Sequence, residues 1–218
     1  MMYFKIAIDC VIIGYDSQLN ELKILLTKRV NMPQKGEWAL PGGFIKKTEG
    51  FEETASSILQ RETGMANVYL RQLKAYSLTD ITQDNRIASV AYYSFIKFEE
   101  LTESGQQQTS RWFPFKEVPP LPFDHSEKVA FASEKIKELV KLEPIAYHLL
   151  PTKFPLNQLQ RFYEALYNIK IDNRNFRKKI LKLPYIERLD ELEKNVSHRP
   201  GHLYRFNPEK YQESSSIY

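Results

Sequence analysis

The fold of this chain is decided by residues 36–65, which read GEWALPGGFIKKTEGFEETASSILQRETGM. Glycine and proline are concentrated in residues 36–44 and predict a loop with a constrained backbone. From Gly50 to Thr63 the residues follow a helical pattern. Gly64 is a natural stop for that helix, because glycine adopts the left-handed conformation at low steric cost. A glycine-rich loop that leads into a helix is therefore the centre of the predicted fold.

Strand-forming segments surround this loop and helix. Residues 4–14 and 22–27 are rich in Ile, Val and Leu, and the turn residues between them predict a β-hairpin. Three further strands and a helix are predicted over residues 68–78, 87–98, 111–115 and 126–142. Helices packed on a mixed sheet make an α/β sandwich the expected architecture.

Charge is distributed unevenly along the 218 residues, of which 31 are Lys or Arg and 27 are Asp or Glu. Residues 144–218 hold 13 basic and 8 acidic side chains, a net charge of +5, whereas residues 1–143 carry −1. The positive excess at the end predicts a polyanionic partner. We expect two domains, residues 1–143 and 144–218, and the aromatic content of 13% argues against a predominantly disordered chain.

Several kinds of protein are excluded. Cys10 is the only cysteine, so neither an intramolecular disulfide nor a cysteine-based zinc site is possible. The apolar stretch 6–15 is too short to span a bilayer, contains Asp9 and lacks the features of a signal peptide. We expect a soluble, cytoplasmic protein without a membrane partner.

The second domain is predicted from two helices and a hairpin. Residues 156–167 are amphipathic, with Pro155 at the start, and Asp172 is placed to cap a second helix that runs to about Leu183. Strand-like residues 185–192 and 202–206 follow, separated by a Pro-Gly turn, and fraying is expected at Ser214–Ser216. This order is typical of a small winged helix-turn-helix domain.

The helix that begins after Asp172 is the strongest candidate for DNA contact. Phe176, Ile180 and Leu183 share one face, which leaves the basic side chains on the other. The first turn of a recognition helix reaches base edges, where Arg suits guanine and Asn suits adenine, while Lys mainly meets phosphate. The alternative is a solvated basic face. The residues expected to contact DNA are Asn173, Arg174, Asn175, Arg177, Lys178 and Lys182.

The loop between the last two strands resembles the wing of such a domain. It carries His198, Arg199 and His202 and is flanked by Arg205. Arginine is favoured in a narrow minor groove, so we expect Arg199 and His202 to contact DNA. A surface turn without a ligand is the alternative.

The stretch from Gly36 to Met65 resembles the signature of the Nudix family, G-x5-E-x7-R-E-U-x-E-E-x-G-U, in which U is a bulky aliphatic residue. The spacing is kept without a gap, and the Trp-containing residues 111–114 are similar to a strand near the end of Nudix domains. The resemblance covers roughly residues 4–142 and implies a Nudix-like α/β/α sandwich with a mixed sheet. The matching positions are Gly43, Glu49, Glu62, Gly64 and Met65.

The metal-binding positions of that signature are changed. Nudix hydrolases bind divalent metal ions between substrate phosphates and glutamates of this helix. Here Ser57 replaces the family's Arg, Ile58 replaces a metal-binding Glu, and Arg61 replaces the first Glu of the final pair. A guanidinium repels Mg²⁺ and an isoleucine offers no oxygen. We therefore expect no catalytic residue, no metal and no cofactor.

No other carboxylates compensate for this loss. Glu52 and Glu53 lie about 14–15 Å along the helix from Glu62, at roughly 1.5 Å per residue, which is too far for one compact site. We interpret them as a solvated first turn that the helix dipole favours.

The ligand pocket of such a domain can persist without catalysis. Asp9 lies in an apolar strand and needs partners there, either internal hydrogen bonds or the hydroxyl groups of a small polar ligand. The pair Asp124–His125 is interpreted as a helix cap before a ligand site. With the pocket walls that the resemblance implies, the expected effector-binding residues are Asp9, Arg29, Trp38, Phe44, Glu62 and Tyr92.

A degenerate Nudix domain followed by a winged helix resembles the Nudix-related transcriptional regulators, which include repressors of NAD metabolism and regulators of arabinose or other pentose use. The resemblance implies a homodimer that binds a small effector and reads a palindromic operator in double-stranded DNA. The effector could be an ADP-ribose-type nucleotide or a pentose, and the missing metal site favours a neutral sugar. The alternatives are a Mg-dependent hydrolase of ADP-ribose or another nucleoside diphosphate derivative, and a protein-interaction module.

Overall fold

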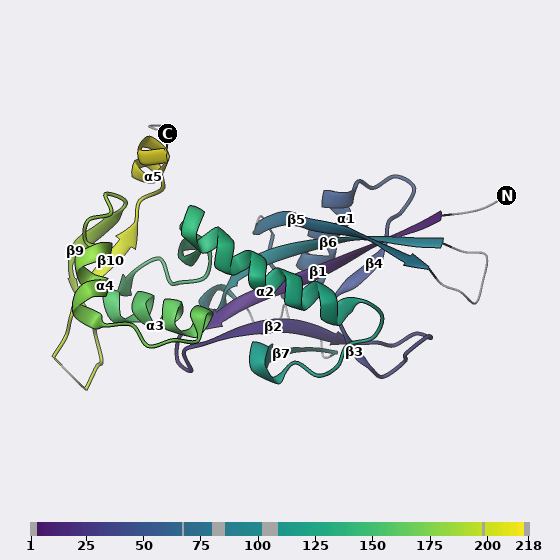
Figure 1. Ribbon diagram of the computed structural model, residues 1–218, viewed down its shortest axis with the longest axis horizontal. Helices are drawn as coiled ribbons and strands as arrows, with labels where there is room; N and C mark the ends of the chain where they lie inside the picture. Colours follow the sequence, from purple (N-terminus) through teal and green to yellow (C-terminus); the bar gives the residue numbers. More distant parts are fainter. Residues whose placement is uncertain (1–3, 67, 80–85, 102–108, 198, 216–218) are drawn as a thin grey trace.

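A mixed β-sheet organises the first part of the chain, as the computed structural model shows (Figure 1). The structure describes residues 4–66, 68–79, 86–101, 109–197 and 199–215. The sheet has seven strands in the order β3-β2-β1-β6-β5, with β4 also paired to β1 and β7 to β2. Only β1 and β6 run parallel in this set of described pairs. The strands are β1 (Phe4–Asp16), β2 (Glu21–Lys28), β3 (Trp38–Ala39), β4 (Gly42–Phe44), β5 (Tyr69–Thr79), β6 (Arg86–Lys97) and β7 (Ser110–Pro114).

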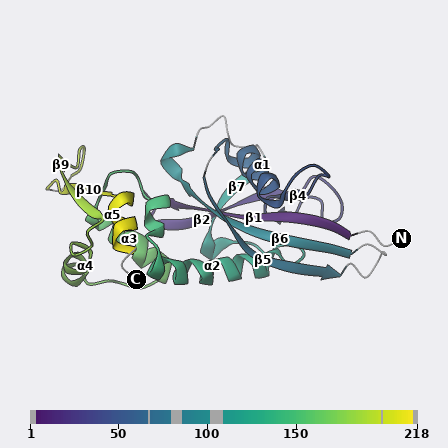
Figure 2. The same ribbon diagram turned by 90° about the horizontal axis from the view of Figure 1, so that it is seen from above.

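Helices α1 (Phe51–Thr63) and α2 (His125–Leu142) cover opposite faces of this sheet (Figure 2). Side chains alternate across a strand, so β1 supplies both hydrophobic cores. Ile8, Cys10 and Ile12 pack in the core under α1, whereas Val11 and its odd-numbered neighbours pack under α2. The predicted α/β/α sandwich with a mixed sheet is confirmed. We call this part, residues 4–142, the sandwich.

The decisive loop and helix fold as the sequence indicates. Helix α1 ends at Gly64, which adopts the left-handed conformation with φ of 72°. At its start the Glu53 carboxylate accepts a hydrogen bond from the Gly50 backbone N–H at 2.9 Å, so this glutamate caps the helix. Short 3₁₀ turns connect other elements: η1 (Phe98–Glu100), η3 (Phe115–Glu117) and η4 (Ile145–His148).

The second part of the chain is a winged helix-turn-helix, as predicted. Helices α3 (Leu156–Tyr167) and α4 (Asn173–Ile180) pack beside a three-stranded sheet in the order β8-β10-β9. We call residues 154–206 the winged helix. Its strands are β8 (Phe154–Pro155), β9 (Ile186–Leu192) and β10 (His202–Phe206).

Two boundaries differ from the sequence prediction. Helix α4 ends at Ile180 rather than near Leu183, because residues 181–183 form turns ahead of Pro184, which disfavours helix in the residue before it. The tail forms helix α5 (Pro208–Ser215), where fraying was expected from Ser214 onward. The Asn207 side chain accepts a hydrogen bond from the Lys210 N–H at 3.1 Å and so caps α5. Ser216 lies outside the described residues.

One hydrophobic core runs from the sandwich into the winged helix. It contains Val11, Tyr15 and Leu26 of the sheet together with Phe162 and Leu166 of α3. The Phe162 ring is fully buried and meets the Tyr15 ring edge-on, with centroids 5.3 Å apart. The two parts therefore pack through shared apolar side chains. Among the described residues, no helix has the length and apolar character needed to cross a membrane.

We predict that Phe162→Ala lowers the free energy of unfolding by about 3–5 kcal/mol, because it leaves a cavity between sandwich and winged helix. Urea unfolding followed by circular dichroism measures the change. Phe131→Ala is the matched control, because the Phe131 ring is 40% exposed, and it should cost less than about 1 kcal/mol. If the winged helix of the Phe162→Ala variant unfolded in a separate transition while the sandwich kept its stability, the shared core would be contradicted.

Candidate functional site

The glycine loop brings β4 unusually close to β1. Gly42 pairs with Asp9, and a Cβ atom at Gly42 would lie 2.7 Å from Asp9 Oδ1 and 2.8 Å from the Ile8 carbonyl oxygen. Any other side chain would force the two strands apart. The contact fixes the Gly42 carbonyl beside the C-terminal half of α1.

On α1, Glu62 is buried and fully engaged, with 2% of its surface exposed. The Ser110 hydroxyl of β7 donates to Glu62 Oε2 at 2.5 Å. Arg61 Nε donates to Glu62 Oε1 at 2.9 Å, and Arg61 Nη2 lies 2.8 Å from the same oxygen. Arg61 Nη2 also contacts the Gly42 carbonyl oxygen at 3.4 Å. These four residues, Arg61 and Glu62 of α1, Ser110 of β7 and Gly42 of β4, form one polar cluster.

The Nudix metal ligands do not fit this helix. Ile58 is 2% exposed and packs in the core, with its Cδ1 atom 4.0 Å from the position of a Cβ at Gly43. Ser57 is exposed to solvent. Within the described residues, no group of His, Cys, Asp or Glu arranged for metal binding includes a residue of α1.

A second polar cluster lies on the other face of the sheet, beneath α2. Lys128 is completely buried, and its Nζ lies 2.6 Å from Asp9 Oδ2, 2.7 Å from Asp124 Oδ1 and 3.0 Å from Ser89 Oγ. The Ser89 hydroxyl also donates to Asp9. Asp9, Asp124 and His125 are close enough together to resemble a metal site, but the Lys128 ammonium already supplies the cation.

Two sequence interpretations are decided by this cluster. Burial raises the pKa of Asp9, but the nearby His125, with Nε2 at 3.5 Å, and Lys128 outweigh it and hold that pKa below its usual range. Asp9 is thus satisfied internally in this structure. Asp124 stands at the N-cap position of α2, as predicted, but its side chain makes no cap hydrogen bond and accepts from Lys128 instead. His125 Nδ1 accepts the Leu40 N–H at 3.0 Å.

The predicted effector-binding residues are divided between the two faces of the sheet. Glu62 and Tyr92 lie on the α1 side, where Tyr92 is 1% exposed within the core. Phe44 pairs with Ala7, which places it on the same face as Asp9, and it is 56% exposed.

The remaining two, Trp38 and Arg29, contact different neighbours. The Trp38 ring packs on Phe113 with centroids 5.0 Å apart, and the Arg29 guanidinium lies 4.9 Å from the Phe123 ring centroid. The set does not form one compact site. Arg61 and Ser110 both contact Glu62, but the sequence did not predict either as a ligand-binding residue. For Arg61, its position directly before Glu62 in the signature was a signal that could have identified it.

Helix α4 exposes its basic side chains as expected. The Asp172 carboxylate caps the helix by accepting the Asn175 N–H at 2.8 Å, and Phe176 and Ile180 are buried against α3 and the core. Asn173 instead donates through its side chain to Gln160 Oε1 at 2.9 Å, which ties it to α3. All six residues predicted to contact DNA from this helix and the turn after it are exposed to solvent: Asn173, Arg174, Asn175, Arg177, Lys178 and Lys182.

The β9–β10 hairpin forms the wing. Arg199 lies in its exposed loop, and His198 lies outside the described residues. His202 is half-buried in β10, and its Nε2 is 2.7 Å from Arg188 Nη2. Arg205 is paired with Glu187 at 2.8 Å. Arg199 is therefore more exposed to solvent than His202.

Aromatic rings join the sandwich to the winged helix through η4. The His148 ring packs on Tyr69 of β5 at an interplanar angle of 43°, with centroids 4.3 Å apart. Burial, together with nearby cations, lowers the pKa of His148 to about 4, so the ring is neutral at neutral pH. The adjacent Tyr147 ring lies 4.9 Å from Phe206 of β10, which in turn contacts Tyr185 at 5.3 Å.

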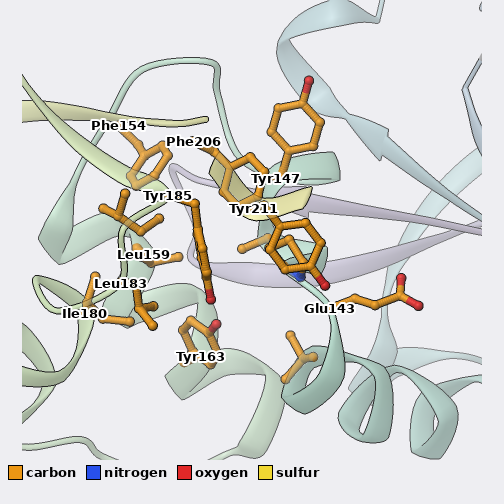
Figure 3. A pocket seen from close by; sticks show the side chains of 14 residues that line it. Glu143, Tyr147, Phe154, Leu159, Tyr163, Ile180, Leu183, Tyr185, Phe206 and Tyr211 are labelled. Carbon is orange, nitrogen blue, oxygen red and sulfur yellow. The ribbon is translucent and has the colours of Figure 1, made fainter. Parts of the chain in front are cut away.

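A small cavity lies among the rings of Tyr147, Tyr185 and Phe206 (Figure 3). Its volume is about 70 Å³, enough for roughly two water molecules at about 30 Å³ each. It is too small for a nucleotide or a pentose, so we assign it to the packing of the junction.

The sequence matches two family models, the NUDIX domain over residues 4–133 and the NrtR DNA-binding winged helix domain over residues 146–206. It is 29% identical over 211 residues to the ADPR responsive transcriptional repressor NtrR of Acinetobacter baylyi, covering 94% of this chain and 82% of that protein. It is also 33% identical over 105 residues to the ADP-ribose pyrophosphatase of Methanocaldococcus jannaschii, covering 48% of this chain and 62% of that protein.

Two solved structures of Shewanella oneidensis NrtR are similar to this chain. The complex with a 27mer DNA superimposes with a TM-score of 0.82 at 25% identity and covers 95% of both chains. The NUDIX domain complexed with ADP ribose gives a TM-score of 0.53 at 28% identity, covering 62% of this chain and 90% of that one.

We predict that Asp9→Asn destabilises the fold by about 3–5 kcal/mol at pH 7, because it leaves the buried Lys128 with one carboxylate fewer. Asp9 has a lowered pKa, so its stabilising effect is present above the ordinary Asp pKa of about 4 and is lost as the pH falls. The difference between wild type and variant should therefore shrink below about pH 4. Urea unfolding at several pH values measures it, with the exposed Asp190→Asn as control. A difference independent of pH would contradict the ion pair.

Proposed function

Because the chain belongs to the NUDIX family and carries an NrtR DNA-binding winged helix domain, we propose that it is a ligand-responsive transcriptional regulator. The observation that carries the proposal is the exposed basic surface of α4, on a winged helix that shares its core with a Nudix sandwich in which Ile58 and Arg61 occupy two metal-binding positions of the signature. We place the domain division at Pro144, giving residues 1–143 and 144–218. The protein would act in the cytoplasm as a homodimer on a palindromic operator.

In this proposal α4 lies in the major groove. Arg174 and Asn175, in its first turn, read base edges, while Lys178 and Lys182 meet phosphates. Arg177 is adjacent and contributes to either. On the wing, Arg199 extends to the neighbouring groove or backbone, and His202 supports the wing through Arg188. The bond from Asn173 to Gln160 makes this residue a brace between α3 and α4 that competes with base contact.

The effector that we propose is ADP-ribose or a related nucleoside diphosphate sugar. The Acinetobacter baylyi relative is named as ADPR responsive, and the similar Shewanella oneidensis domain was solved with ADP ribose. The changed metal-binding positions alone favour a neutral sugar. Arg61 retains a positive charge beside Glu62, so loss of the metal ligands does not remove the basis for binding a diphosphate.

The shared core supports a mechanical link between ligand and DNA. Since α3 packs on β2 and β1, a shift in the sandwich moves the winged helix with it. In a homodimer this would change the spacing of the two α4 helices and hence the fit to an operator.

A Mg-dependent hydrolase is the second candidate, favoured by the identity to the Methanocaldococcus jannaschii pyrophosphatase. The engaged oxygens of Glu62 and the apolar Ile58 oppose it. Incubation with ADP-ribose and Mg²⁺ separates the two, because a hydrolase releases AMP and loses that activity in Glu62→Gln.

We predict that the double variant Arg174→Ala, Arg177→Ala weakens binding to DNA from upstream of the gene by at least about 100-fold, since two charged contacts are lost. Fluorescence anisotropy at several salt concentrations measures the affinity. The wild-type affinity should fall steeply with salt, and the variant should show a smaller slope. Lys135→Ala, Lys137→Ala on α2 removes the same charge as a control and should bind normally. Equal affinities for all three proteins would contradict DNA contact by α4.

We further predict that ADP-ribose changes the DNA affinity by about 5- to 150-fold. Linkage requires that saturating DNA change the ADP-ribose affinity by the same factor. Calorimetric titrations with and without operator test this equality. A pentose that produces the shift, with ADP-ribose inactive, would overturn the proposed effector and leave the regulator intact.

A further inference from the structure

Arg61 occupies the metal-binding position of α1 and engages the one glutamate that remains there. Its Nε and Nη2 atoms lie 2.9 Å and 2.8 Å from Glu62 Oε1, while the Ser110 hydroxyl lies 2.5 Å from Oε2. Both oxygens of Glu62 therefore have donors. A divalent cation would have to displace the guanidinium to reach this carboxylate.

The ion pair also orients Arg61. The Glu62 side chain is 2% exposed and the Arg61 side chain 45% exposed, so the buried carboxylate anchors a guanidinium whose outer edge meets solvent. A second contact, from Nη2 to the Gly42 carbonyl at 3.4 Å, holds the plane of the guanidinium against β4. Nη1 makes no hydrogen bond to any residue that the structure describes. An anchored fork with an open donor is organised before a ligand arrives.

Charge balance here does not call for a metal ion. The carboxylate of Glu62 is neutralised by Arg61, and the other two acidic signature positions on α1 hold Ile58 and Arg61. Glu49, which precedes the helix, is paired with Lys46 at 2.7 Å. A guanidinium presents several N–H donors in one plane and matches the oxygen atoms of a phosphate. The attraction between the guanidinium and a diphosphate would also be stronger in these partly buried surroundings than in bulk water.

We propose that Arg61 replaces the metal ion as the phosphate-binding group of the effector site, so that this chain binds a nucleoside diphosphate sugar without divalent cations. Glu62 acts as a positioning residue, which holds the guanidinium in place. The inference rests on the proposed sensing of ADP-ribose and adds the chemical group that recognises its diphosphate.

Isothermal titration of ADP-ribose into the full-length chain tests this, once with EDTA and once with Mg²⁺. The wild type should bind equally under both conditions. Arg61→Gln should bind about 10- to 100-fold more weakly under both, because a charged hydrogen bond to phosphate is lost while the amide can still donate to Glu62. Arg61→Lys, which keeps the charge and loses the fork, should fall between them. Arg71→Gln removes an exposed arginine of β5 and serves as the matched control, with wild-type affinity.

The outcomes separate this inference from the proposed function. Binding that requires Mg²⁺ overturns the role of Arg61 and leaves ADP-ribose as the effector. Metal-independent binding that Arg61→Gln does not weaken, in a variant with wild-type circular dichroism, overturns it as well. If ADP-ribose fails to bind under either condition, the proposed effector falls together with this role.

Discussion

The apolar contact between the α2 side of the sheet and α3 is the interaction on which the rest of the structure depends. The even-numbered apolar side chains of strand β1 pack in the core beneath α1, and the odd-numbered ones pack in the core beneath α2. The second core does not end with the sandwich, because Phe162 inserts from α3 beside Tyr15. The position of the recognition helix α4 is set in turn by its packing on α3, through Phe176 and Tyr163. Sensor and reader are thus built on one continuous apolar framework.

Polar residues divide into those that hold this framework and those left for partners. Lys128, Asp9 and Ser89 satisfy one another beneath α2 and join the sheet to the helix. Their burial leaves them little freedom to meet a ligand. Arg61 and the basic residues of α4 are different, because each has a fixed base and an exposed charged end. This distribution agrees with a protein whose Nudix helix has exchanged metal chemistry for recognition.

Most of the fold could be predicted from the sequence, because local signals determine it. A segment rich in Ile and Val predicted β1, and Gly64 predicted the end of α1. Contacts between distant residues could not be predicted in this way. The pattern around Asp9 showed that it needed partners, but not that a lysine 119 positions later would supply the cation. The same limit applies to the effector residues, since strand pairing decides which face Phe44 occupies and only the fold brings Ser110 to Glu62.

The continuous core also bears on how such proteins can be recombined. A boundary near Pro144 is visible in charge and in family matches, yet no gap in packing accompanies it. A winged helix transplanted from a relative would arrive with side chains shaped for a different sheet, and Tyr15 would face a foreign surface. Exchange of DNA specificity by domain shuffling is therefore constrained, whereas change confined to the exposed side of α4 is not. New operators are more accessible to this architecture through point substitution than through exchange of modules.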